Sequence, residues 1–133
     1  MAALKLQADR IDGTNAISRH GPDGVIVNGA QHTRSVIVPW TGDVTAWPVT
    51  SFEELAADHF ATLVGFKPEL VIFGSGRRIR FASPALLRPL MDQRIGIETM
   101  DTAAACRTYN VLLAEGRNVV AALLFEGCAS SIG

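Results

Sequence analysis

The chain has 133 residues, and 48% of them are hydrophobic, which is enough material for one domain with a substantial core. Twelve basic residues against thirteen acidic ones leave a net charge of -1. The composition therefore gives no general attraction to nucleic acid or to anionic lipid. We expect a single domain over residues 1–133 and no nucleic-acid partner.

Two features of the sequence concern its compartment. The longest strongly apolar run, Val119 to Phe125, is far shorter than the roughly 20 residues that a membrane-spanning helix needs. The N-terminus lacks the basic start, apolar stretch and cleavage site of a secretory signal. The two cysteines, Cys106 and Cys128, form neither a disulfide framework nor a metal-binding quartet. We expect a cytoplasmic protein without a membrane span.

The first part of the chain alternates short apolar runs with turn clusters and is expected to form β structure. A dense turn signal at residues 20–24 precedes the apolar run Val25–Val27. Asn28-Gly29, the dipeptide favoured in two-residue hairpin turns, comes before the run Val36–Val38. We predict a hairpin with its turn at Asn28-Gly29.

A short strand and a helix are expected next. The strand lies around Val44–Trp47, and Pro48 limits it to a sheet edge or an ending because proline cannot donate a backbone hydrogen bond. Ser51 and Glu54 then match the capping-box pattern that starts a helix. Gly65 is expected to end that helix.

The second half of the chain is typical of an α/β unit. Short apolar runs bounded by turn signals predict strands at Leu70–Phe73, Gly96–Met100 and Val119–Phe125. Ser83 with Pro84 predicts the start of one connecting helix, and Asp101 or Thr102 starts a second that ends near Gly116. Since helices connect the strands, we expect parallel pairing in one sheet, with the Asn28-Gly29 hairpin in a separate layer.

A candidate crevice follows from this topology. Gly74-Ser75-Gly76 and Asp101-Thr102 follow two predicted strands, at the edge where an open α/β sheet exposes a crevice. A dinucleotide loop is disfavoured because Ile79 occupies the place of the third glycine and no helix follows at once. The alternative is that the glycines only allow a tight exit from the strand.

Basic and amide side chains extend the candidate site. Arg107 and Asn110 are three apart on the second helix, and we predict that both face the glycine turn. With the arginines at residues 77, 78, 80 and 117 they would surround an anion; the alternative is that they form ion pairs and tie down loops. The candidate crevice or ligand-binding residues are Gly74, Ser75, Gly76, Asp101, Thr102, Arg107, Asn110 and Arg117.

No catalytic residue, metal ligand or cofactor is assigned. His59 lies on the apolar side of the predicted helix, which favours a hydrogen-bonded structural histidine over a general base. Cys106 lies inside a helix, where a packing thiol is the more common role. Trp40 and Trp47 either cover the edge of the core or, if exposed, indicate a protein interface.

Several motifs resemble one known family. They are Phe73-Gly74-Ser75-Gly76, Ser83-Pro84 and above all the run from Met100 to Leu123. The chain resembles the small α/β domain family of largely unknown function that includes mitochondrial complex I assembly factor 3. The first part fits more weakly, through His20-Gly21, the hairpin and Trp47.

The resemblance implies a three-layer α/β domain with a central mixed five-stranded sheet, helices against it and an added β-hairpin layer. The family has no established enzymatic activity, and it usually has threonine where this chain has Ser75. Its mitochondrial member works with protein partners to assemble a membrane respiratory complex.

We expect a non-catalytic binding or assembly-accessory protein with a protein partner. That partner is expected to belong to a membrane or respiratory complex. The competing hypothesis is a small-molecule or anion-binding domain, or an enzyme, that uses the crevice at the glycine turn. The partner, the ligand and the oligomeric state stay open.

Overall fold

The computed structural model describes residues 13–126, so Cys128 lies outside the described residues. The elements in chain order are β1 (Ile17–Gly21), β2 (Gly24–Val27), β3 (Ala30–His32), β4 (Val36–Pro39), β5 (Thr45–Ala46), the 3-10 helix η2 (Phe52–Glu54), α2 (Ala57–Val64), β6 (Leu70–Gly74), α3 (Pro84–Asp92), β7 (Gly96–Met100), α4 (Thr102–Ala114) and β8 (Val119–Leu123).

A five-stranded mixed sheet lies at the centre of the molecule, with the strand order β5-β4-β8-β6-β7. β6 runs parallel to both β7 and β8, whereas β4 is antiparallel to β8 and to β5. The prediction that the three strands of the second half share one sheet is confirmed. β5 is an edge strand, as Pro48 after it indicated.

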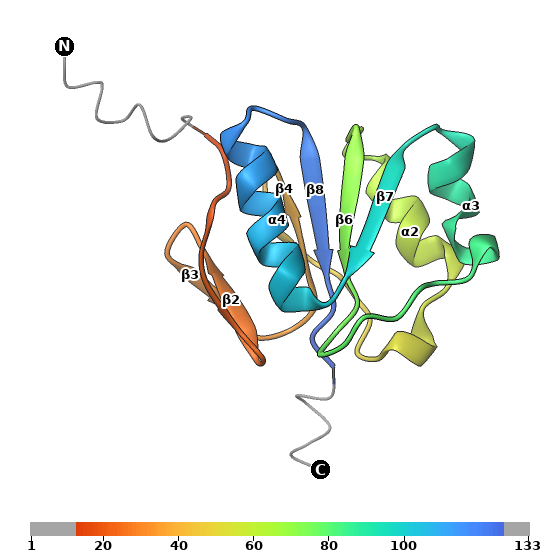
Figure 1. Cartoon of the computed structure of the whole chain (residues 1–133), viewed down its shortest axis with the longest axis horizontal. Helices are drawn as coiled ribbons and strands as arrows, with labels where there is room; N and C mark the ends of the chain where they lie inside the picture. Colours follow the sequence, from red (N-terminus) through yellow and green to blue (C-terminus); the bar gives the residue numbers. More distant parts are fainter. Residues whose placement is uncertain (1–12, 127–133) are drawn as a thin grey trace.

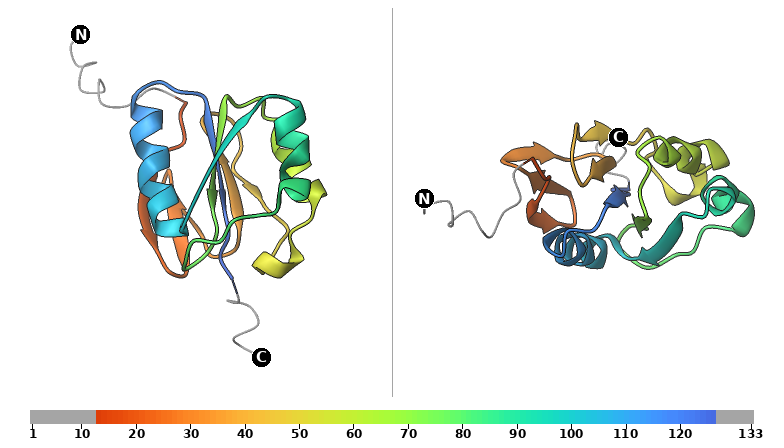
Figure 2. Two further views of the ribbon diagram at one scale, coloured as in Figure 1. Left: turned by 45° about the vertical axis from the view of Figure 1, so that its right-hand side comes forward. Right: turned by 90° about the horizontal axis from the view of Figure 1, so that it is seen from above.

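Two apolar clusters cover the two faces of this sheet. On β8, Val119, Ala121 and Leu123 belong to the cluster beneath α4 and the sheet β1-β2-β3. Val120 and Ala122 belong to the cluster beneath α2 and α3. All residues of β8 are buried, because a strand covered on both faces exposes neither set of side chains. Figures 1 and 2 show the resulting layers, so the predicted three-layer α/β architecture is confirmed.

The hairpin turn is at the predicted place, but its second arm is not the predicted run. Asn28 and Gly29 have φ angles of 51° and 86° between β2 and β3, the left-handed values that a two-residue hairpin turn requires. The arm that returns is Ala30–His32, whereas Val36–Pro39 pairs with β8 in the central sheet. The physical reason is that all residues of Val36–Pro39 are buried, as suits an interior strand.

The helix predicted to start at Ser51 is also corrected. The Ser51 side chain makes no capping hydrogen bond, and the Glu54 carboxylate instead accepts from the N–H and hydroxyl of Thr50, both at 3.0 Å. Only η2 forms at this point. α2 begins after Ala56, whose N–H donates to Nδ1 of His59 at 3.0 Å. The capping role belongs to a histidine that the sequence pattern did not indicate.

The other two helices begin where the sequence predicts, and α4 also ends there. Pro84 is the first residue of α3, and Ser83 precedes it. Asp101 caps α4 by accepting from the N–H of Ala104 at 2.8 Å, and Gly116, with a φ of 78°, follows its end. Within residues 13–126, no helix has the length and apolar character needed to cross a membrane.

Trp47 is a core residue rather than an interface residue. Its side chain is buried, its indole N–H donates to the carbonyl of His59 at 3.1 Å, and its ring meets those of Phe60 and Phe73 edge to face. Trp40 is partly buried against the cluster on the other face of the sheet. Both tryptophans therefore cover the core, the first of the two roles considered from the sequence.

Candidate functional site

The glycine turn after β6 is built around the hydroxyl of Ser75. The side chain is fully buried, and its Oγ donates to the carbonyl of Arg78 at 2.9 Å and accepts from the N–H of Arg80 at 2.9 Å. The carbonyl of Met100 lies 3.2 Å from the same oxygen. These bonds satisfy the hydroxyl as both donor and acceptor, so it fixes the shape of the loop.

A second hydroxyl, that of Thr102, joins three elements. Its Oγ1 accepts from the N–H of Gly76 at 2.8 Å and donates to the carbonyl of Leu124 at 2.9 Å. The backbone N–H of Thr102 donates to the carbonyl of Gly76 at 2.8 Å. The end of β6, the start of α4 and the segment after β8 are therefore connected. The structure brings Gly74, Ser75, Gly76, Asp101 and Thr102 together, as the topology predicted.

Gly74 and Gly76 suit glycine for different structural reasons. A Cβ on Gly74 would lie 2.9 Å from Cα of Thr102 and 3.1 Å from Cβ of Ala105, so glycine allows α4 to pack directly on β6. Gly76 has a φ of 110°, which side chains rarely adopt, and a Cβ there would meet the Glu126 carboxylate at 2.9 Å. Both positions serve the turn and the close approach of the elements.

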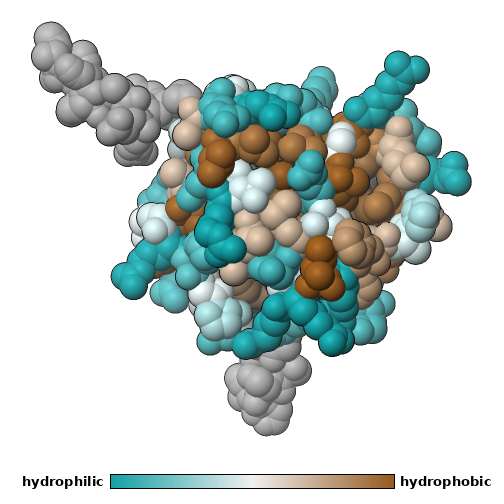
Figure 3. Space-filling model, in the orientation of Figure 1, coloured by the Kyte–Doolittle hydropathy of each residue, from teal (hydrophilic) through white to brown (hydrophobic). Residues whose placement is uncertain are grey.

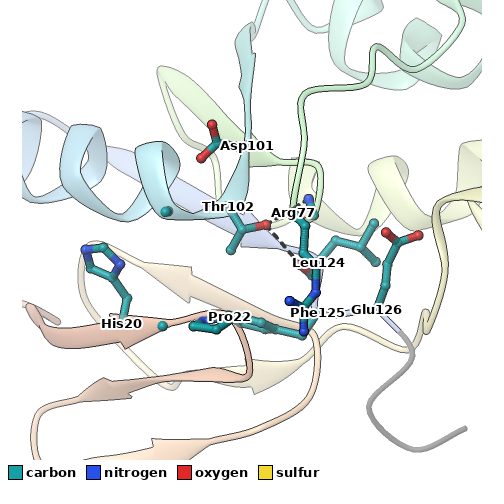
Figure 4. Close-up of a pocket in the computed structure, with 11 residues that line it drawn as sticks. His20, Pro22, Arg77, Asp101, Thr102, Leu124, Phe125 and Glu126 are labelled. Atoms are coloured by element: carbon teal, nitrogen blue, oxygen red, sulfur yellow. Dashed lines mark hydrogen bonds between the residues drawn. The ribbon is translucent and has the colours of Figure 1, made fainter. Parts of the chain in front are cut away.

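A cavity of about 440 Å³ lies beside this junction (Figure 4). Its wall comes from the turn between β1 and β2 (His20, Pro22), the loop after β6 (Arg77), the start of α4 (Asp101, Thr102) and the segment after β8 (Leu124, Phe125, Glu126). Its size suits a small ligand. Because it combines apolar, acidic and basic side chains, the lining does not select one ligand charge.

Of the arginines that follow the glycine turn, Arg77 and Arg80 are engaged with separate acids rather than with one shared anion, and Arg78 is exposed. Arg77 pairs with Asp23 at 3.3 Å, and both side chains are exposed. Arg80 pairs with Glu126 and, at 3.3 Å, with Glu53. Its guanidinium also lies 4.5 Å from the centre of the Phe52 ring. Arg80 thus connects the loop to η2 and to the segment after β8.

Asn110 does not face the glycine turn, so this part of the prediction is wrong. Its amide N–H donates to the carbonyl of Ile17 at 2.6 Å, and its Oδ1 accepts from the N–H of the same residue at 3.0 Å. The side chain fastens β1 to α4, about 12 Å along the helix from Thr102 at 1.5 Å per residue. Arg107 is exposed and does not line the cavity.

Arg117 lies at the opposite end of the sheet. It contacts the Glu69 carboxylate through two nitrogens, at 3.1 and 3.3 Å, just before β6 begins. The N–H of Asn118 also donates to that carboxylate, and together these bonds lower the pKa of Glu69. Arg107, Asn110 and Arg117 are therefore separate from the crevice. These residue types suit a polar ligand site, but their positions in the structure are away from the crevice.

Sequence reasoning missed most of the cavity wall. His20 and Pro22 were recognised as part of a turn, but no local signal showed that this turn packs beside α4. Leu124, Phe125 and Glu126 were expected to belong to, or to follow, a buried strand. The available signal was that β8 ends at the same edge of the sheet as β6, which places the residues that follow it beside the glycine turn.

The side chains of Cys106 and His59, which could in principle be reactive, have structural roles. Burial raises the pKa of the Cys106 thiol to about 12, so it stays protonated and is a poor nucleophile. His59 accepts from Ala56 through Nδ1, and its Nε2 lies 3.2 Å from the carbonyl of Pro48. Within residues 13–126, no three His, Cys, Asp or Glu side chains are grouped to hold a metal ion.

Comparison with known proteins identifies the family. Residues 17–124 match the model of a protein family of unknown function, DUF498/DUF598. The chain belongs to this family. Its relatives include NADH dehydrogenase [ubiquinone] 1 alpha subcomplex assembly factor 3 of Bos taurus, which is 32% identical over 111 residues. An uncharacterised protein of Rhodobacter capsulatus is 36% identical over 118 residues, covering 84% of this chain and 86% of the relative.

The similarity extends to solved structures. A crystal structure from Bordetella parapertussis has a TM-score of 0.81 and 36% identity, and the match covers 86% of this chain and 98% of that one. The match with the bovine assembly factor covers 81% of this chain but only 59% of the factor. The expected family is thus confirmed, and its relatives include proteins named as complex I assembly factors.

Proposed function

We propose that this DUF498/DUF598 family member is a non-catalytic binding or assembly-accessory protein that acts with protein partners of a membrane respiratory complex. The observation that carries the proposal is the use of the two hydroxyls at the glycine turn. Ser75 and Thr102 each donate and accept within the fold, so neither is free to attack or hold a substrate. The names of the relatives support the assembly role.

The proposal is tested by capturing partners in the native cell. A tagged full-length chain is expressed at its natural level, cross-linked and analysed by quantitative mass spectrometry, with the tag on an unrelated domain as the control. We expect enrichment of respiratory-complex subunits or of their assembly intermediates. Equal recovery of these proteins with the control would contradict the assembly role. Cell fractionation in the same experiment tests the cytoplasmic location that belongs to the proposal.

The cavity supports the second candidate, a small-molecule or anion-binding domain or an enzyme. Its volume of about 440 Å³ is within the range of ligand sites. A thermal-shift panel of phosphates, carboxylates and nucleotides tests it, with Arg77→Ala as the cavity variant and Arg88→Ala, an exposed substitution on α3, as the control. A ligand that stabilises the wild type and the control but not Arg77→Ala would favour this candidate over the first.

A further inference from the structure

β7 is an edge strand whose inner side is fully paired. Two bonds fix its orientation: the N–H of Gly96 donates to the carbonyl of Glu69 at 3.3 Å, and the N–H of Ser75 donates to the carbonyl of Met100 at 2.9 Å. In a parallel ladder, alternate residues of a strand direct both backbone groups to the same neighbour. Every second residue from Gly96 to Met100 therefore directs its N–H and C=O toward β6.

The two residues of β7 that alternate with these direct their backbone groups to the other, outer side of the strand. Ile97 and Thr99 direct their N–H and C=O groups away from β6, and no strand lies beyond β7. Within residues 13–126, no turn, loop or side-chain hydrogen bond involves these two residues. Both are partly exposed. Four backbone groups are thus available along an open edge, which is the template that an added strand requires.

Apolar side chains border this edge. Among the described residues, the exposed large hydrophobic side chains are Ile79, Phe81, Met91 and Val111, with exposures of 49%, 71%, 56% and 58%. Met91 lies on α3, which packs beside β7. Ile79 and Phe81 lie on the loop that leaves β6, passes the carboxyl end of β7 and reaches α3 (Figures 1 and 2). Figure 3 shows hydrophobic surface over this part of the molecule.

Charge argues against a second copy of the same strand as the occupant. Glu98 is exposed at the centre of β7, and none of the ion pairs within residues 13–126 involves it. Antiparallel self-pairing that uses the outer groups of both Ile97 and Thr99 places Glu98 opposite Glu98 of the other copy. Like charges directly opposite each other destabilise a strand pair. A basic side chain opposite Glu98 has the reverse effect.

We infer that the outer edge of β7 binds an extended segment of a partner protein by strand addition. The segment carries a Lys or Arg opposite Glu98 and apolar side chains that contact Phe81, Ile79 or Met91. The inference rests on the proposed function in protein binding, and it adds the place and the chemistry of recognition. Backbone bonds to Ile97 and Thr99 supply the affinity, and the charge and the apolar contacts select the sequence.

The experiment uses peptides selected on the full chain. A phage library of short random peptides is panned against the immobilised protein, and the selected peptides are synthesised for affinity measurements. The key variant is Thr99→Pro, because its missing N–H lies on the outer side and the bonds to β6 are retained. A thermal melt confirms that this variant folds. Hydrogen exchange followed by NMR reports the amides of Ile97 and Thr99 directly.

We expect the selected peptides to contain a basic residue and to protect the amides of Ile97 and Thr99. Thr99→Pro and Glu98→Lys each weaken binding by about tenfold or more, and a peptide with Glu in place of its basic residue regains affinity for Glu98→Lys. The matched controls are Val111→Ala, on the exposed face of α4, and Glu115→Lys, at the exposed residue that follows the helix. Both keep wild-type affinity.

Three outcomes would overturn the inference: no peptide is selected, Thr99→Pro binds as tightly as the wild type, or the two amides stay unprotected. The proposed function fails separately. If the wild type and Thr99→Pro capture the same respiratory proteins in cells, the assembly role stands and the β7 assignment is wrong. If peptides bind at β7 but respiratory proteins are not enriched, the edge assignment stands and the assembly role is wrong.

Discussion

At the scale of single residues, the Ser75 hydroxyl offers a direct test of the glycine turn. Ser75→Ala leaves the part-buried N–H of Arg80 and carbonyl of Arg78 without their side-chain partner. We expect the free energy of unfolding to fall by about 1–3 kcal/mol. Chemical denaturation measures it, with Ser18→Ala as an exposed control that changes stability by about 0.5 kcal/mol or less. An equal effect of both substitutions would contradict the structural role of Ser75.

The buried thiol of Cys106 predicts a loss of stability at alkaline pH. Its pKa is about 12 in the fold, against 9.0 for an exposed thiol. Between these values the unfolded chain has lost the proton and the folded chain has kept it, so rising pH favours unfolding. Each such group contributes a slope of up to about 1.4 kcal/mol per pH unit. Denaturation from pH 8 upward measures the slope.

Cys106→Ala is the comparison for this pH dependence. The variant has a lower stability at neutral pH, because burying a smaller side chain leaves a void, but it lacks the titrating thiol. Its stability should therefore fall less steeply above pH 9.0 than that of the wild type. The pKa of Tyr109 is also raised by burial, and it contributes equally to both curves. Identical slopes in the two proteins would contradict the assignment to Cys106.

Residue types alone do not reveal which polar side chains share a site. The placement of Asp101 and Thr102 beside Gly74-Ser75-Gly76 was predictable, since the carboxyl ends of parallel strands meet at one edge of a sheet. Asn110 was placed wrongly because its partner, Ile17, lies in a layer added by the remote N-terminal part of the chain. A sequence pattern within a helix carries no information about such a partner.

At the scale of elements, the close contact of α4 with β6 depends on Gly74. A Cβ there would approach Cα of Thr102 to 2.9 Å, so Gly74→Ala forces a shift of backbone. We expect a loss of about 1–3 kcal/mol in unfolding free energy. Gly21→Ala is the control, because a Cβ at this position meets no atom within 4 Å, and it should cost about 0.5 kcal/mol or less. Chemical denaturation measures both variants. Equal losses of unfolding free energy would show that the close approach of α4 to β6 does not cause the cost of Gly74→Ala.

The elements also show where prediction from sequence works and where it fails. The strands and helices after residue 70 were placed closely because each is bounded by strong local signals, such as Pro84, Asp101 and Gly116. The helix expected at Ser51 failed because Glu54 bonds to Thr50 instead of completing a capping box. The destination of Val36–Pro39 depended on β8, far along the chain, and no local pattern specifies that pairing.

At the scale of the whole molecule, the two edges of the central sheet are protected differently. β5 has only two residues, Thr45 and Ala46, and Pro48 follows close behind, so this edge offers little for another strand to pair with. β7 has five residues and no proline. Its main protection against self-pairing is the charge of Glu98. An open edge with an exposed acid at its centre fits the proposed binding of a basic partner segment better than pairing with its own copy.

The last prediction follows from this difference between the edges. Glu98→Val removes the repulsion between facing carboxylates, which is on the order of 0.2–1 kcal/mol for a directly opposed pair, and adds a side chain that favours strands. Sedimentation velocity over a concentration series is expected to show a monomeric wild type and a variant that self-associates as its concentration rises. Glu115→Val removes an exposed acid from the end of α4 instead and should remain monomeric. If Glu98→Val also stayed monomeric, or if the wild type already paired through β7, then Glu98 would not be what keeps this edge free.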